Sequence, residues 1–147
     1  MGLDSFWVVP DGIPHPIFEP KLCLVGSFVS NNKEFQGGFR GKIYADLIED
    51  ITGISIYQRR IPNKTIRKMA NLLEKAELSK FIGKPITFRD RPELDGVNAI
   101  MKMLASTGHT EIRQCGEGDP ITADELIDLQ RMFRAYADAG ARLEGDW

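Results

Sequence analysis

Residues 36–44, with the sequence QGGFRGKIY, place three glycines and two cations directly before an expected helix. Such a loop can hold a phosphate, because glycine lets the backbone approach an anion and the first N–H groups of a helix have no partner within it. A Walker A loop has the pattern G-x-x-x-x-G-K-[ST]. Counting back from Gly41 and Lys42 puts Gln36 at its first glycine and Ile43 at its hydroxyl position, so this segment is not a P-loop.

An electrostatic argument for an anion remains at the same loop. Arg40 and Lys42 stand at the start of the expected helix, whose dipole already makes that end positive, and each costs about 0.3 to 1 kcal/mol there. An anion would relieve this cost if both side chains are exposed, as we expect. In the alternative interpretation, the glycines only allow close packing and carboxylates such as Glu19 or Glu34 neutralise the cations. The candidate anion site comprises Gly37, Gly38, Arg40, Gly41 and Lys42.

A second basic element, Arg59 and Arg60, follows Tyr57 closely in the sequence. Cations beside an aromatic ring can bind single-stranded nucleic acid. The chain carries a net charge of -2, which gives no overall attraction to nucleic acid, so we do not expect that partner. Arg59 and Arg60 are kept as candidate ligand-binding residues.

Acidic residues give a weaker pattern in the same region. Asp46 and Asp50 lie four residues apart on one helix face, a spacing that suits a divalent metal or acid–base catalysis. We favour a solvated face, or pairing with Arg59 and Arg60, over either chemistry.

Histidine and cysteine are too scarce to define a site. His15 lies between prolines, whereas His109 and Cys115 bound one short expected strand and permit a Cys–His pair or part of a zinc site with Cys23. No C-x-x-C pair supports such a site. We interpret Cys23 and Cys115 as buried small hydrophobic residues in a reducing compartment, and predict no metal and no cofactor. No catalytic residue is assigned.

Length and composition indicate one domain over residues 1–147, cytoplasmic and without a membrane segment. Of the 147 residues, 42% are hydrophobic and 27% are charged, which is ordinary for a globular protein. No run of about 18 apolar residues is present, and Phe6 stands where a myristoylation signal needs Ser or Thr. Oligomeric state stays open.

Apolar spacing predicts the elements that position these residues. Strands are expected at 3–9, 21–29 and 54–60, with a short last strand at 109–115. Helices are expected from Lys42 to a left-handed cap at Gly53, from Pro62 to about Glu77, and over 95–106. Residues 81–93 are expected to form a long loop, with a short strand or a lid as alternatives.

The final helix has the clearest start signal. Thr122 and Glu125 have the spacing of a capping box, and Ile121 and Leu126 that of a hydrophobic staple, so a helix is expected up to Gly140. The side chains expected to join this helix to the first strand in one core are Trp7, Phe133 and Tyr136. The fold class is predicted as α+β, a single compact domain with a sheet of about four short strands and about four helices.

Three stretches carry a resemblance: MGLD at the start, FRGKIYADLIEDITGISIYQ in the centre and YADAGARLEGDW at the end. Together they resemble a group of small uncharacterised proteins of phages and bacterial genomes, in which a second aromatic is expected where Asp146 stands. The resemblance leaves out residues 63–121. It implies a viral accessory protein and no particular activity.

The sequence thus predicts a protein that binds a protein partner or a small anionic ligand. The alternative is an enzyme that acts on a phosphorylated or nucleotide-like substrate through Arg40 and Lys42. An enzyme should show a deep pocket with several titratable groups, whereas a binding module should show an exposed interaction surface.

Overall fold

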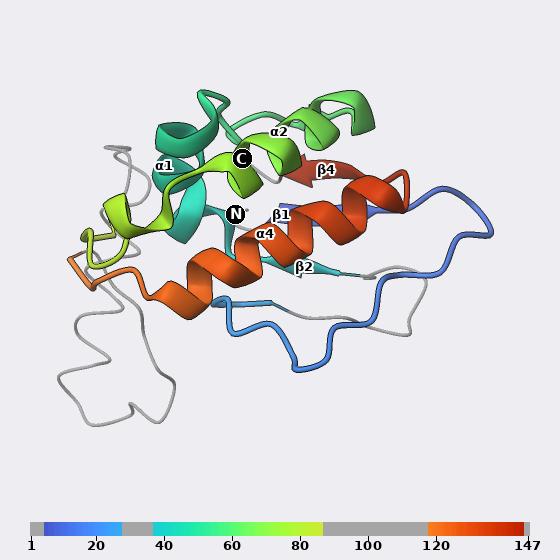
Figure 1. The fold of residues 1–147 in the computed structure, drawn as a ribbon. Helices are drawn as coiled ribbons and strands as arrows, with labels where there is room; N and C mark the ends of the chain where they lie inside the picture. The colour runs from blue at the N-terminus through green and yellow to red at the C-terminus, as the bar shows by residue number, and fades with distance from the viewer. Residues whose placement is uncertain (1–4, 28–36, 87–117, 146–147) are drawn as a thin grey trace, which may run out of the picture.

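Four short strands of the described residues form one antiparallel sheet in the order β2-β1-β4-β3 (Figure 1). This computed structural model describes residues 5–27, 37–86 and 118–145. In the register, Ser5 lies opposite Phe39, while Trp7 and Ile61 both lie opposite Leu143. These residues are buried, so one face of the sheet carries the core. The strands are β1 (Ser5–Val8), β2 (Gly38–Phe39), β3 (Arg60–Ile61) and β4 (Arg142–Gly145).

The helices of the described residues are α1 (Gly41–Thr52), α2 (Asn63–Lys75) and α4 (Ala123–Asp138), with a 3-10 turn η1 (Leu78–Lys80). In Figure 1, α2 and α4 run side by side in front of the sheet. They are antiparallel, because Asn63 at the start of α2 bonds to Ala137 near the end of α4, whereas Gln130 bonds to Leu73 further along α2. The α+β fold class is therefore confirmed.

Aromatic rings join β1 to α4, as the sequence predicts. The ring of Trp7 stacks on that of Tyr136 at 4.6 Å and meets the edge of Phe133 at 5.1 Å. All three side chains are buried, and Phe39 of β2 packs against Trp7 and Phe133. Aromatic pairs of these geometries stabilise a core beyond their buried area.

The ends of the helices also agree with the sequence. Thr122 and Glu125 form the expected capping box, and Ile121 and Leu126 are buried beside it. Gly53 ends α1 in the left-handed region, with φ 73°, and its N–H donates to the carbonyl of Glu49.

Two expected strands are wrong within the described residues. Residues 21–27 contain a turn at 24–26 and no strand, because the N–H of Val25 donates to the Tyr44 hydroxyl and its carbonyl accepts from Arg40 N–H instead of from a neighbouring strand. Of the expected strand 54–60, only Arg60 belongs to β3. The strands β2 and β4 were not predicted.

The other expected elements fall at or beyond the edge of the described residues. In the expected loop 81–93, Pro85 forms an isolated bridge with Pro120. The expected helix 95–106 and strand 109–115 lie outside the described residues. Within the described ranges, the helices fall short of the length and apolar character that crossing a membrane requires.

Candidate functional site

The candidate loop 37–42 connects β2 directly to α1. Gly37 accepts a hydrogen bond from the N–H of Trp7 at 2.9 Å, and Gly38 pairs with β1. Arg40 is the residue before α1, and its N–H donates to the carbonyl of Val25 at 3.0 Å. The loop therefore has the expected position at a helix start.

Close packing explains at least one of its glycines. A Cβ atom on Gly37 would collide with the hydroxyl oxygen of Tyr136. Outside the loop, Gly26 has φ +69° and lies against Arg40, where a Cβ atom would stand 3.1 Å from that of the arginine. These contacts favour the alternative interpretation, in which the glycines make room for side chains.

Burial at the start of α1 corrects one expectation. Lys42 is only 2% exposed and Arg40 is half-buried, so the expectation that both side chains are exposed is wrong for Lys42. The apolar residues that follow, Ile43 and Tyr44, are buried as well, and they draw the first turn of α1 into the core. An anion at this helix end would bind in an enclosed space, where charge interactions are stronger than in water.

A buried polar contact links α1 to α4. The hydroxyl of Tyr44 donates to Glu125 at 2.6 Å, and the other carboxylate oxygen of Glu125 accepts from Thr122 in the capping box. Both oxygens of this carboxylate thus have donors, which satisfies a buried acidic group. We interpret Glu125 as structural.

The remaining titratable candidates do not assemble into a metal site. No group of three potential ligands occurs among the residues that the structure describes. Arg60 pairs with Glu144 rather than with Asp46 or Asp50. The ring of His15 packs on Tyr136, with 3.2 Å from its Nδ1 to the hydroxyl. His109 and Cys115 lie outside the described residues.

Cys23 is exposed, so its expected burial is wrong. Its N–H donates to the carboxylate of Asp128 at 2.7 Å. Partial desolvation of the thiol, together with this carboxylate, raises the pKa of Cys23 to about 12. A thiol with that pKa is a poor nucleophile at neutral pH.

Arg59 and Arg60 begin a run of exposed basic residues. Within residues 59–68 there are five cations and no acidic residue, although the whole chain has a net charge of -2. Arg142 of β4 adds a sixth, because its guanidinium shares a carboxylate with that of Arg60. All six are exposed. We call these six exposed residues together the basic face; they are Arg59, Arg60 and Arg142 on and beside the sheet, and Lys64, Arg67 and Lys68 on α2.

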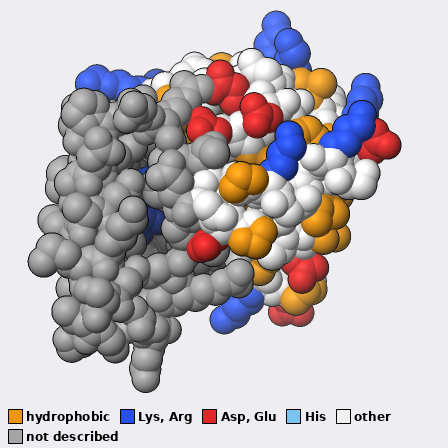
Figure 2. Space-filling view, turned by 90° about the vertical axis from the view of Figure 1, so that its left-hand side faces the viewer, with side chains coloured by type: hydrophobic (Ala, Val, Ile, Leu, Met, Phe, Trp, Pro, Cys, Tyr) orange, Lys and Arg blue, Asp and Glu red, His pale blue; other side chains and the backbone are white. Residues whose placement is uncertain are grey.

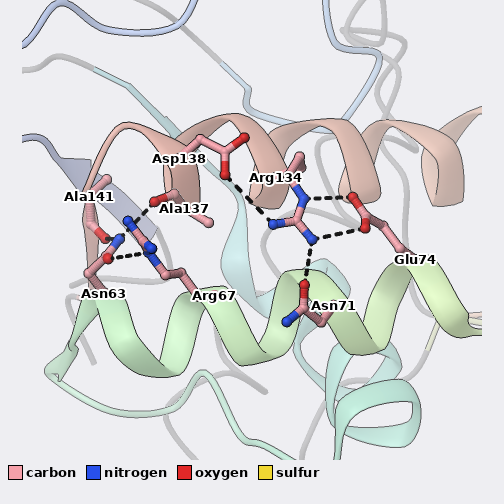
Figure 3. A network of polar contacts seen from close by, with 8 residues as sticks. All are labelled: Asn63, Arg67, Asn71, Glu74, Arg134, Ala137, Asp138 and Ala141. Atoms are coloured by element: carbon pink, nitrogen blue, oxygen red, sulfur yellow. Dashed lines mark hydrogen bonds and ion pairs between the residues drawn. The ribbon is translucent and has the colours of Figure 1, made fainter.

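Hydrogen bonds connect the α2 part of the basic face to the end of α4 (Figure 3). The side-chain amide of Asn63 donates to the carbonyls of Ala137 and Ala141, at 3.1 and 2.9 Å. Its oxygen accepts from Nε of Arg67 at 2.9 Å. Arg67 is thereby held near Ala141, the residue that precedes Arg142.

A second group of charges in Figure 3 is neutralised internally. Arg134 of α4 donates to both carboxylate oxygens of Glu74, at 2.7 and 2.9 Å, and to Asn71. Its guanidinium also lies 3.7 Å from Asp138. The hydrogen bond from Arg134 holds the pKa of Glu74 below its usual value. This network fastens α2 to α4.

The hollows lined by described residues include an open groove and a smaller pocket. An open groove of about 480 Å³ lies between residues 17–19 and α4, but its arginines already pair, Arg131 with Asp128 and Arg134 with Glu74. A smaller pocket beside α1 is mainly aliphatic. Its volume of about 180 Å³ is below the usual volume of a cofactor site. On the side of the molecule drawn in Figure 2, exposed hydrophobic side chains are interspersed with charged ones.

The geometry therefore divides the predicted site residues into two groups. Gly37, Gly38, Gly41 and Lys42 are buried around the start of α1, whereas Arg59 and Arg60 are exposed on β3 and beside it. No protein-family model, curated protein or solved structure matches the chain.

Proposed function

We propose that this is a small phage-type accessory protein that acts in the cytoplasm by binding an anionic partner through the basic face. The observation that carries the proposal is the concentration of charge, with five cations and no acidic residue in residues 59–68 of a chain of net charge -2. Local fields of this kind attract and orient an anionic partner even when the whole protein is acidic.

The chemistry of the basic face suits binding better than catalysis. Its side chains are guanidinium and ammonium groups on exposed positions, which donate hydrogen bonds and positive charge. The pocket beside α1 is mainly aliphatic, and in the open groove Arg131 and Arg134 are already paired with Asp128 and Glu74. The resemblance to small phage proteins supports an accessory role.

The partner that fits this surface is the acidic surface of another protein or a small anionic ligand. A fluorescent deca-glutamate peptide serves as a probe for the first. We expect it to bind with an affinity that falls as salt rises. The double substitution Lys64→Ala with Lys68→Ala should weaken binding severalfold, up to about tenfold, since each exposed charge pair contributes a fraction of the 1.4 kcal/mol that a factor of ten represents.

A matched control keeps the same loss of charge elsewhere. Lys75 and Lys84 are exposed and lie outside the basic face, so Lys75→Ala with Lys84→Ala should leave binding nearly unchanged. Equal loss in both double variants would contradict the proposal. Tighter binding of a single-stranded oligonucleotide of equal charge than of the peptide would contradict a protein partner.

A second candidate function rests on Lys42. Lys42 is only 2% exposed at the first turn of a helix, and both it and Arg40 already interact with other groups of the protein. A phosphate of a small or nucleotide-like substrate would add charge and hydrogen bonds to those that compensate the buried ammonium. Under this proposal the protein is an enzyme that acts on a phosphorylated substrate, and phosphate should stabilise it.

A further inference from the structure

The basic face contains one place where two guanidinium groups meet. The same oxygen of Glu144, Oε1, lies 3.2 Å from Nε of Arg60 and 3.1 Å from Nε of Arg142. All three side chains are on the solvent side of the sheet, because Arg60 pairs opposite Glu144 and Arg142 lies two residues before it in β4. Backbone pairing of β3 with β4 therefore fixes their positions.

The two arginines keep most of their hydrogen-bonding capacity. A guanidinium has five N–H donors, and in each arginine only the Nε–H is used by Glu144. The side chains of Arg60 and Arg142 are 67% and 44% exposed, so both are accessible to a ligand from solvent. Because Glu144 carries a single negative charge, it neutralises only one of the two guanidinium groups, and the group as a whole stays positive.

The geometry points to a phosphoryl-binding clamp made by Arg60 and Arg142, with Glu144 as its internal occupant. This inference rests on the proposed function and names its ligand class. A phosphoryl dianion offers three terminal oxygens and enough charge for two guanidiniums, whereas a carboxylate offers two oxygens and a single charge. An incoming phosphoryl group displaces the carboxylate of Glu144 and accepts hydrogen bonds from both guanidinium groups.

Free phosphate and a phosphorylated side chain present the same chemistry. Titrations with inorganic phosphate and with a phosphoserine peptide separate these sources, and acetate is the carboxylate control. The readout is the chemical shift of the arginine Nε–H signals, which report on Arg60 and Arg142 directly. We expect both phosphoryl ligands to shift these two signals at concentrations where acetate does not.

Charge-preserving variants isolate the clamp from the basic face. Arg60→Lys with Arg142→Lys keeps the net charge but removes both forks, and should weaken phosphate binding about tenfold. Binding of the deca-glutamate peptide should change less than about twofold, because it depends mainly on total charge. Lys75→Arg, a charge-preserving change at an exposed position outside the basic face, should leave both affinities unchanged.

Glu144→Gln provides the second test. It removes the competing charge while keeping the size of the side chain, so phosphate should bind more tightly. Three results would overturn the clamp: an Arg40→Ala background in which the double lysine substitution leaves the affinity for phosphate unchanged, weaker phosphate binding to Glu144→Gln, or no shift of the Arg60 and Arg142 signals by phosphate in the wild type. If the wild-type protein does not bind the deca-glutamate peptide, the proposed function is overturned instead.

Discussion

The ring planes of Trp7 and Tyr136 are nearly parallel, 4° apart, with 4.6 Å between their centroids. This stack joins the first strand to the last helix, two elements from opposite ends of the described chain. The hydroxyl of Tyr136 projects past the stack toward His15 and Gly37. The packing of the loop before α1 therefore depends on a side chain of α4.

Gly37→Ala should destabilise the protein by about 1 to 3 kcal/mol, because the added methyl group meets the hydroxyl oxygen of Tyr136. Urea unfolding measures this free energy. In a Tyr136→Phe background the oxygen is absent, so the same substitution should cost clearly less. Equal costs in both backgrounds would show that another contact explains the glycine.

Thr122→Ala should lower the free energy of unfolding by about 0.5 to 2 kcal/mol. Its hydroxyl accepts from the N–H of Glu125 at 3.2 Å, and the substitution leaves that donor without its cap. Thr122→Ser keeps the oxygen and should recover most of the loss. A change near zero for the alanine variant would mean that the cap contributes little to the stability of α4.

Local signals explain why α1, α2 and α4 could be predicted. A capping box, a cap at Gly53 and apolar residues at helical spacing all act within one element. The strands β2 and β4 depend on distant partners instead. Gly38 belongs to a strand only because it pairs with Phe6, and in β4 only Leu143 is fully buried. Neither β2 nor β4 therefore has the alternating apolar residues from which a strand is predicted.

The candidate site was predictable to a similar extent. Arg59 and Arg60 were singled out from the sequence, and Lys64, Arg67 and Lys68 stand in the same run of cations, a signal that was available but was not used. The further basic residue, Arg142, reaches Arg60 only through the pairing of β3 with β4. Burial of Lys42 likewise comes from tertiary packing.

The thiol of Cys23 should react slowly although the residue is exposed. Because its pKa is raised to about 12, almost none of it is thiolate at pH 8. In a Cys115→Ala background, alkylation by iodoacetamide should be far slower than that of free cysteine. Asp128→Asn removes the nearby negative charge and should speed the reaction. A wild-type rate equal to that of free cysteine would contradict this account.

Acid should remove the contribution of Asp128 to stability. Its burial tends to raise the pKa, but hydrogen bonds from the N–H of Cys23 and from Arg131 outweigh this and hold the pKa below its usual value. A carboxyl group whose pKa is lower in the folded state stabilises the fold above its unfolded pKa, about 3.9, and loses that effect as pH falls through the folded pKa. The difference in unfolding free energy between wild type and Asp128→Asn should therefore be largest near neutral pH and shrink below about pH 4. A difference that is constant from pH 7 to 3 would show that Asp128 acts through packing alone.

Phosphate should stabilise the protein through the start of α1 if Arg40 and Lys42 hold an anion there. The double lysine variant of Arg60 and Arg142 is the right background, since it removes the proposed clamp and leaves α1 intact. In that background, phosphate at 100 times its Kd should add about 2.7 kcal/mol to the free energy of unfolding, and Arg40→Ala should reduce this gain.

Lys42→Met should be destabilising even without phosphate, because Lys42 is only 2% exposed and its loss leaves the groups that compensate the buried ammonium unpaired. The alternative, in which protein groups alone neutralise both cations, predicts no gain from phosphate in this background. A flat phosphate titration would therefore remove the anion site at α1, and with it the argument for an enzyme, while leaving the basic face untouched.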